Sequence, residues 1–390
     1  MRGSIVKRKS GYTVVYDVGQ KWSEEKAQWV RKQKWEKVKS PDTRKHAEKI
    51  LAERLSQINR GEFIEPSAMT FAEYAEIWLN KYARIEVRPS TLAQYLYLFR
   101  GHIFPAIGNI QLQHLGSEEL QGLKAQKLSA GLSPQTVKHI MRLVRQMLKH
   151  AVSWSYIRTN PATAVRDPKV PRQEMDFLTA DEVKVLLNNC PDRYYALFLT
   201  AVTGGLRIGE LLAMKWSGID WQSGKYHVKE TLTRTMETSV AGFAPVKTET
   251  SAKPIDLTPS CLEALKQHRA GQAEEKLKSG DTYVDNDLVF ATVLGKPLND
   301  RNLVNRVFHP TLADAGLRRI KFHGLRHTCA SLLIDQGESP KYVQTQMRHA
   351  SIKITFDTYG HLYPDSHREA TTRLDEMLFG PPRPATGTSC

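Results

Sequence analysis

Apolar and polar positions divide the chain into three stretches with different periodicities. Residues 1–65 open with short alternating runs, which predict three strands. These runs are Ser4 to Lys7, Gly11 to Val18 and Trp29 to Trp35. A helical pattern from Thr43 to Gln57 follows, and then the Gly- and Pro-containing run Gly61 to Ser67 breaks both periodicities. We expect a small module of three strands and one helix, followed by a linker.

The second stretch, residues 66–170, has a helical pattern throughout. Candidate helices lie at 70–82, 90–100, 117–128 and 134–154. Ser133-Pro134 offers an N-cap followed by proline at the first helical position, which predicts where the last of these helices begins. The stretch is therefore predicted to be an all-helical domain.

The last of these helices separates into two faces. Its apolar positions recur at helical spacing: Val137, Ile140, Met141, Val144, Met147, Leu148 and Ala151. Lys138, Arg142, Arg145 and Lys149 recur at intervals of four, three and four, and form a second, basic stripe. A solvated charged face is the alternative interpretation. Because no acidic residue interrupts the stripe, we expect this helix to lie against DNA phosphates.

The third stretch runs from about 175 to 379 and is mostly helical, with a β-rich part from Lys225 to Leu257. Thr179 and Glu182 predict a capping box at the start of a helix. The polar tail after Gly380 is predicted to be disordered. The expected fold class is α+β and multidomain, with domains at 1–65, 66–170 and 171–379 and a tail at 380–390.

The charge distribution favours a nucleic-acid partner. The formal net charge is +15, and Lys and Arg exceed Asp and Glu by seven over residues 1–65 and by seven over residues 66–170. Over the remaining 220 residues the excess is one. The first 170 residues are therefore expected to bind a polyanion, with Lys7, Arg8 and Lys9 among the contacts. An anionic membrane is the weaker alternative.

Other classes are disfavoured by the sequence. It contains no apolar run near the length of a membrane span, and its basic N-terminus lacks the apolar core of a signal peptide, so a cytoplasmic protein is expected. Four isolated cysteines show no metal-binding spacing and are predicted to be free thiols. These are Cys190, Cys261, Cys329 and Cys390.

Four short segments of the third stretch could carry chemistry. They are Thr203 to Leu212, His323 to His327, Arg348 to Ser351, and Asp357 to His361. Arg207 follows two glycines at a predicted helix start, where free backbone N–H groups favour an anion, and Glu210 could simply pair with it. His323 and Arg326, three apart, point the same way on a helix. A zinc helix using His323 and His327 is disfavoured, because Gly324 occupies the position of the catalytic glutamate.

These segments, in this order, resemble the tyrosine recombinase (phage integrase) family, whose signature is Arg, Lys, His-x-x-Arg, His or Trp, and Tyr. The matching residues are Arg207, His323, Arg326, His349 and Tyr359. The segment Pro245 to Leu257 resembles the family's β-hairpin, which implies Lys247 as the catalytic lysine, with Lys253 as the runner-up. Arg348 departs from the glycine of many relatives and could alter how His349 is presented. The doubled Gly204-Gly205 is a second departure.

The resemblance implies a metal-independent and ATP-independent reaction without a cofactor. Two guanidinium groups, of Arg207 and Arg326, would clamp the phosphate, and His323 and His349 would donate further hydrogen bonds. Tyr359 would attack the phosphorus and form a 3′-phosphotyrosyl link, with His323 as the candidate base and Lys247 as the general acid. Tyr363 is the nearest rival nucleophile.

The resemblance also implies how the protein is organised. Residues 1–65 would bind arm-type DNA sites, residues 66–170 core sites, and residues 171–379 would be catalytic. The expected protein is an integrase of a temperate phage or other mobile element, acting as a homotetramer on double-stranded DNA at the bacterial nucleoid. An excisionase and a host DNA-bending protein are possible partners, and Ser366 to Phe379 would dock on a neighbouring subunit. A type IB topoisomerase and a non-cleaving DNA-binding regulator are the alternatives.

Overall fold

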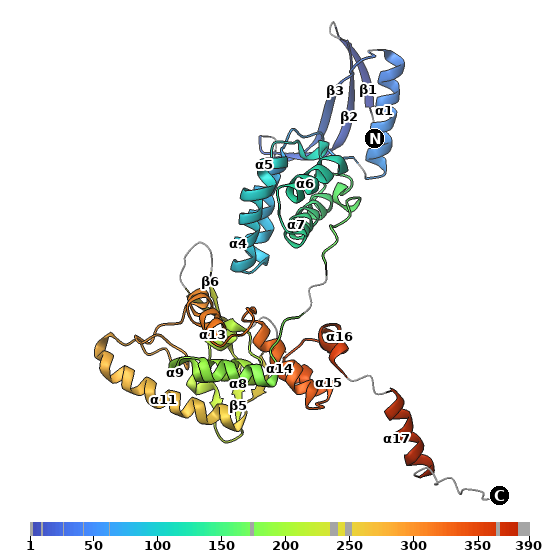
Figure 1. Cartoon of the computed structure of the whole chain (residues 1–390). Coiled ribbons are helices and arrows are strands. Elements are labelled where there is room, and N and C mark those ends of the chain that lie inside the picture. Colours follow the sequence, from blue (N-terminus) through green and yellow to red (C-terminus); the bar gives the residue numbers. More distant parts are fainter. Residues whose placement is uncertain are drawn as a thin grey trace, which may run out of the picture. The chain divides into compact units, whose positions relative to one another are not determined.

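A computed structural model describes residues 3–8, 11–25, 27–41, 43–61, 63–171, 175–234, 241–245, 252–363 and 367–380. The chain divides into two compact units, Met1–Pro171 and Arg172–Cys390, shown in Figure 1. The predicted α+β class is confirmed, with small antiparallel sheets among many helices.

The first unit begins with an antiparallel sheet in the order β1-β2-β3, with α1 along one face (Figure 1). The elements are β1 (Gly3–Arg8), β2 (Gly11–Ser23), β3 (Gln28–Lys37) and α1 (Arg44–Asn59). Val14, Tyr16 and Ala47 form the core between sheet and helix. Glu36 on β3 accepts hydrogen bonds from Tyr16 and from Arg54 of α1 and ties the helix to the sheet. The predicted strands and helix are therefore confirmed.

The face of β3 opposite to Glu36 is exposed to solvent. Exposed and partly buried residues alternate along this strand, as expected where one face of a sheet is covered by a helix. The exposed residues between the strand ends are Trp29, Arg31, Gln33 and Trp35. The guanidinium of Arg8 lies 4.9 Å from the centre of the Trp35 ring. This face thus combines aromatic surface with basic groups.

The remainder of the first unit is helical. The main helices are α2 (Phe71–Trp78), α4 (Pro89–Leu98), α6 (Ser117–Ser129) and α7 (Pro134–Ser153). Short π-helical turns continue α2 into α3 (Arg84–Glu86) and α4 into α5 (Phe104–Ile107), so both run farther than the sequence predicted. Ser133 caps α7 by accepting the backbone N–H of Thr136 at 3.2 Å, as expected. All seven predicted apolar positions of α7 are buried, together with Leu143.

The second unit packs its helices around α9 and α14. Its helices are α8 (Ala180–Asn189), α9 (Asp192–Gly204), α10 (Ile208–Leu212), α11 (Pro259–Ser279), α12 (Asp300–Leu303), α13 (His309–Asp314), α14 (Gly324–Asp335), α15 (Pro340–Gln346), α16 (Ile352–Tyr359) and α17 (His367–Phe379). Thr179 and Glu182 form the predicted capping box at α8. The apolar core includes Phe198 of α9, Leu265 of α11 and Leu325 of α14. This core fixes the helix ends on which the candidate site lies.

Two small sheets occupy the predicted β-rich part of the second unit. One has the order β4-β5-β8, and the other pairs β6 with β7. The strands are β4 (Ile219–Asp220), β5 (Lys225–His227), β6 (Glu230–Arg234), β7 (Ala241–Pro245) and β8 (Pro254–Asp256). Lys247 lies outside the described residues, and so do Lys9, Cys390 and the tail after Gly380. Lys253 is exposed just before β8.

Candidate active site

Arg326 lies at the centre of the candidate site and is almost fully buried, with 3% of its surface exposed. Its Nη1 donates a hydrogen bond to the carbonyl of Gly205, in the turn between α9 and α10. Its Nη2 donates to the carbonyl of Met347, at the end of α15. Burial, reinforced by the positive charges of Arg207 and Arg348, lowers the pKa of Arg326 to about 10, so the group stays cationic at neutral pH. One guanidinium thus connects three segments that are distant in the sequence.

The turn before α10 presents Arg207 to the site. Gly205 has a φ of +60°, a conformation that suits glycine, and a Cβ there would lie 2.3 Å from the Cε of Met347. Arg207 follows with extended backbone as the N-cap of α10, one position before the predicted first turn. Its Nη1 donates to Glu210 Oε1 at 2.9 Å, and its backbone N–H donates to Glu210 Oε2 at 3.0 Å. The expected Arg207–Glu210 pair is present, but Glu210 is buried and not a surface group.

Arg348 supplies a second cation for the same carboxylate. Its side chain is completely buried, and its Nη2 donates to Glu210 Oε2. Its backbone has a φ of +50°, and its Nε and Nη1 have no hydrogen-bond partner among the described residues. Burial alone would raise the pKa of Glu210, but Arg348 and Arg207 together lower it below its usual range. Arg348 therefore turns toward α10, and the structure gives its departure from the glycine of many relatives a specific contact.

His349 and Tyr359 lie together, and the charge of Arg326 acts on both. The Nδ1 of His349 and the hydroxyl of Thr355 are 2.9 Å apart, which orients the imidazole. The ring of Tyr359 stacks on that of His349 with 6.2 Å between centroids. Burial, with Arg326 and Arg207 adding to it, lowers the pKa of His349 to about 4. The imidazole is therefore neutral at pH 7 and can donate one hydrogen bond to an anion.

The hydroxyl of Tyr359 contacts a residue that sequence reasoning did not assign to the reaction. Tyr359 is 1% exposed, and its hydroxyl lies 2.8 Å from Nδ1 of His327. Burial raises the pKa of Tyr359 to about 12, while Arg326 and Arg207 act against that rise. In the sequence, His327 stands out only as half of a possible zinc pair with His323. Its position directly after Arg326 is the one sequence feature that could have indicated a role in the reaction.

His323 precedes the first residue of α14 and is exposed to solvent. Its ring lies 4.9 Å from that of His327, edge to face. Partial desolvation, with His327 and the nearby arginines contributing, lowers the pKa of His323 below its usual range. The hydrogen bond recorded for the Tyr359 hydroxyl goes to His327, so the role of His323 as the base stays a prediction.

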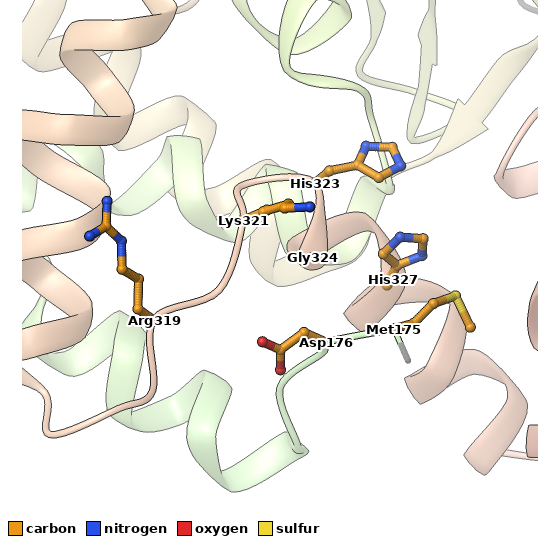
Figure 2. Close-up of a pocket in the computed structure, with 7 residues that line it drawn as sticks. All are labelled: Met175, Asp176, Arg319, Lys321, His323, Gly324 and His327. Atoms are coloured by element: carbon orange, nitrogen blue, oxygen red, sulfur yellow. The ribbon is translucent and has the colours of Figure 1, made fainter. Parts of the chain in front are cut away.

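A cavity of about 600 Å³ opens beside these two histidines. It is lined by Met175, Asp176, Arg319, Lys321, His323, Gly324 and His327. Figure 2 shows both imidazole rings together on one side of it. With two basic side chains and two imidazoles in its wall, the cavity favours anions and water over apolar ligands.

Tyr363, the rival nucleophile, has a different environment. Its ring packs against Phe356, with 6.0 Å between centroids. Its hydroxyl is buried and has no hydrogen-bond partner among the described residues. Of the two tyrosines, Tyr359 alone is recorded in contact with imidazoles.

The basic stripe of α7 is less uniform than the sequence predicted. Arg142 and Lys149 are exposed and Lys138 is half-buried, but Arg145 is engaged within the unit. Arg145 donates to the carbonyls of Ala162 and Val165 and to the carboxylate of Asp167, the last at 2.9 Å. The expectation of a stripe free of acidic residues is thus corrected, because Asp167 follows α7 in the chain and folds back onto it.

Among the residues that the structure describes, no group of three or more His, Cys, Asp or Glu side chains is arranged to hold a metal ion. No helix in this described part of the chain combines the length and the apolar character needed to cross a bilayer. Cys190, Cys261 and Cys329 are buried free thiols, as predicted for them.

Comparison with known proteins matches two family models to the chain. Residues 176–365 match the phage integrase family, and residues 70–128 match the phage integrase N-terminal SAM-like domain. The chain belongs to the phage integrase family of tyrosine recombinases. It is accordingly a DNA breaking and rejoining enzyme.

Relatives cover nearly the whole integrase. A XerC-like tyrosine recombinase of Caldanaerobacter subterraneus subsp. tengcongensis is 28% identical and aligns over 95% of this chain and 97% of its own. The ICEBs1 integrase of Bacillus subtilis (strain 168) is 24% identical over 86% of this chain and 91% of its own. The match thus extends beyond the catalytic part to both units.

Solved integrases share the fold. The Tn1549 transposon integrase in complex with transposon right end DNA superimposes with a TM-score of 0.66, at 18% identity, over 80% of this chain and 99% of that one. A lambda integrase tetramer bound to a Holliday junction gives a TM-score of 0.56, at 20% identity, over 93% of this chain and 95% of that one. Both of these structures are complexes with DNA.

The buried Glu210–Arg348 pair can be tested by a double-mutant cycle. Glu210→Leu leaves Arg348 buried without its counter-charge, and we expect it to lower the free energy of unfolding by about 3–5 kcal/mol. Glu210→Leu combined with Arg348→Met should recover most of that loss, because an apolar pair then replaces the charges. Urea unfolding of the full chain measures these two variants and the single variant Arg348→Met, which completes the cycle. Strictly additive effects would show that the two side chains do not interact.

Proposed function

We propose that this integrase is a site-specific recombinase that integrates and excises a phage or other mobile element through a 3′-phosphotyrosyl link at Tyr359. One observation carries the proposal. The fold gathers Arg207, Arg326, His349 and Tyr359 from four separate motifs into one partly buried cluster. Family membership supports it independently.

The arginines of this cluster provide the phosphate clamp. The side chain of Arg207 is 43% exposed while its partner Glu210 holds it in place, so its guanidinium can reach a phosphate at the surface. Arg326 uses two of its five N–H groups on backbone carbonyls, and these bonds fix its orientation. Permanently charged forks of this kind neutralise the phosphodiester and stabilise the charge that develops on its equatorial oxygens. His323 and His349, neutral at pH 7, add donors.

The chemistry proceeds by transesterification. The Tyr359 oxygen attacks the phosphorus as the bond from phosphorus to the 5′ oxygen breaks, and Lys247 supplies the proton that the leaving oxygen needs. Lys253 is the alternative acid. Attack by the 5′-hydroxyl of a partner duplex reverses the step and exchanges strands. The covalent link conserves the bond energy, so the proposed reaction needs neither ATP nor a cofactor.

The first unit would bind DNA through two surfaces. We assign residues 66–170 to core sites, with α7 facing the phosphates through Lys138, Arg142 and Lys149. We assign residues 1–65 to arm sites, where the exposed face of β3 joins basic groups such as Arg8 to tryptophan surface. Residues 171–379 are the catalytic domain in this proposal.

Assembly as a homotetramer on double-stranded DNA is proposed from the exposed side of α17. Leu374, Met377 and Leu378 recur at helical spacing and are 56%, 83% and 62% exposed. An unpartnered apolar stripe of this kind suits docking on a neighbouring subunit. An excisionase and a host DNA-bending protein remain candidate partners, in the cytoplasm of a bacterial host.

Covalent trapping tests the nucleophile. The purified full chain is incubated, without metal or ATP, with DNA from the ends of its element that carries a nick to prevent religation. We expect a denaturation-resistant protein–DNA adduct that Tyr359→Phe abolishes, because phenylalanine lacks the attacking oxygen. Tyr363→Phe is the matched control and should keep the adduct.

Other outcomes of this experiment would redirect the assignment. An adduct that survives Tyr359→Phe and disappears with Tyr363→Phe would move the chemistry to Tyr363. Relaxation of supercoiled DNA that lacks any specific site would favour a type IB topoisomerase. Tight, specific DNA binding without any adduct would favour a non-cleaving regulator.

The salt dependence of DNA binding distinguishes the basic residues of α7 that contact phosphate from the one that is bound within the protein. We expect Arg142→Gln and Lys149→Gln each to weaken binding and to reduce the slope of log K against log salt by about 0.9, the value of one lost phosphate contact. Arg145→Gln should leave that slope unchanged and lower the stability of the first unit, because Arg145 is bound to Asp167. Fluorescence anisotropy of labelled core-site DNA measures the slope. A reduced slope for Arg145→Gln with no change for the other two would contradict the assignment.

A further inference from the structure

The nucleophile contacts a histidine outside the matched signature. We propose that His327 is the catalytic base, whose Nδ1 receives the proton of Tyr359 as the phenol attacks the phosphorus. The inference rests on the proposed function, since it presumes that Tyr359 is the nucleophile. In this proposal His327, and not His323, is the base, and His323 donates a hydrogen bond to the phosphate.

The geometry places His327 correctly for this transfer. The distance of 2.8 Å between the Tyr359 hydroxyl and Nδ1 of His327 is within the range for proton transfer to a positioned base. The two rings approach edge to face, with 5.7 Å between centroids. His327 lies at the end of the first turn of α14, and Tyr359 ends α16. Tyr359 shares a buried cluster with Cys329 and Ala330 of α14, and this cluster holds donor and acceptor together. No conformational change within the described residues is needed to form the pair.

The surroundings of His327 keep it able to accept a proton. Burial, with the charge of Arg326 adding to it, lowers the pKa of His327, so the ring is neutral at pH 7. His323 lies at its edge, and the phenol of Tyr359 faces it from α16. Across the cavity lie Lys321 and Arg319, with Asp176 as the acidic group in the wall. Met175 adds an apolar group to the wall.

The cavity offers a route for the proton after transfer. His327 belongs to its wall, so the imidazolium that forms can exchange its proton with water there (Figure 2). His323 is exposed next to it and remains available to donate to a phosphate oxygen. The two neighbouring histidines thus have different roles: His327 accepts the proton of the nucleophile, and His323 donates a hydrogen bond to the substrate.

The step balances in atoms and charge. The bond between the Tyr359 oxygen and phosphorus forms, and the bond between phosphorus and the 5′ oxygen breaks. The phenolic proton goes to His327, and Lys247 protonates the 5′ oxygen. When strands rejoin, the same groups act in reverse, and His327 returns a proton to the departing phenolate. Arg207 and Arg326 stabilise that phenolate, consistent with their effect on the pKa of Tyr359.

The pH dependence of single-turnover cleavage tests the assignment in the full chain. His327→Gln retains hydrogen-bonding groups but does not titrate, and we expect cleavage of the nicked site at pH 7 to be about 100-fold slower or more. The cleavage rate of the wild-type protein should not change with pH above about pH 7, where a histidine base is neutral. In His327→Gln the rate should still rise about tenfold per pH unit, because hydroxide must then remove the proton.

Two matched histidine variants serve as controls. His323→Gln should slow cleavage but keep the level pH profile, because it removes a phosphate donor and not the base. His227→Gln, at an exposed position of β5, should leave rate and profile unchanged. DNA affinity and thermal unfolding of each variant exclude a general folding defect.

Two chemical substitutions, one in the nucleophile and one in the substrate, test proton transfer separately from any effect of the variants on folding. Replacing Tyr359 by trifluorotyrosine makes the phenol more acidic, so it should restore at least about tenfold of the rate lost in His327→Gln. A 5′-phosphorothiolate substrate has a leaving group that needs no acid. It should leave the His327→Gln defect in place and remove the defect of Lys247→Ala.

The opposite pattern overturns the proposal. A level wild-type-like profile in His327→Gln, or a rate loss that trifluorotyrosine does not reduce, would show that His327 does not accept the proton. Loss of the level region in His323→Gln alone would assign the base to His323. An adduct that survives Tyr359→Phe would instead refute the proposed function, so the two failures are distinguishable.

Discussion

The candidate site depends on one buried cation, the guanidinium of Arg326. Its bonds to the carbonyls of Gly205 and Met347 hold the turn that carries Arg207 and the segment that carries His349 against α14. A buried charge is costly unless its hydrogen bonds are made, so these contacts tie the folding of the second unit to the geometry of the clamp. Gly205 lies in the same turn with a φ of +60°, a conformation that suits glycine.

The charges of the site are unbalanced in a way that suits its substrate. Arg207 and Arg348 both pair with one buried carboxylate, Glu210, whose charge also acts on Arg326. The histidine beside them, His349, is held neutral by burial and by these cations. A phosphodiester would therefore supply negative charge that the folded protein lacks at this point. The same excess of cations favours the phenolate form of Tyr359 once the proton has an acceptor.

Much of this architecture could be predicted from the sequence. The three strands, the first helix, the two-faced α7 and the matched motifs rest on local periodicity, capping and spacing, and the structure contains each element. Contacts between distant segments could not be predicted in this way. Arg145 fitted the basic stripe, but its partner Asp167 is 22 positions away, and the fold alone brings them together.

The same limit explains the two surprises near Tyr359. Arg348 differs from a common glycine, and no local pattern indicates that its side chain reaches Glu210, 138 positions earlier. His327 lies 32 positions before Tyr359, and only the fold brings the two side chains into contact. Side-chain directions at such distances follow from tertiary packing and not from periodicity.

The central claim is that Tyr359 becomes covalently joined to a 3′ phosphate. The most direct measurement is mass spectrometry of the trapped adduct after digestion with protease and nuclease. We expect a single peptide spanning Tyr359 that carries a 3′-linked nucleotide on that side chain. A nucleotide on Tyr363 or on any other residue would contradict it.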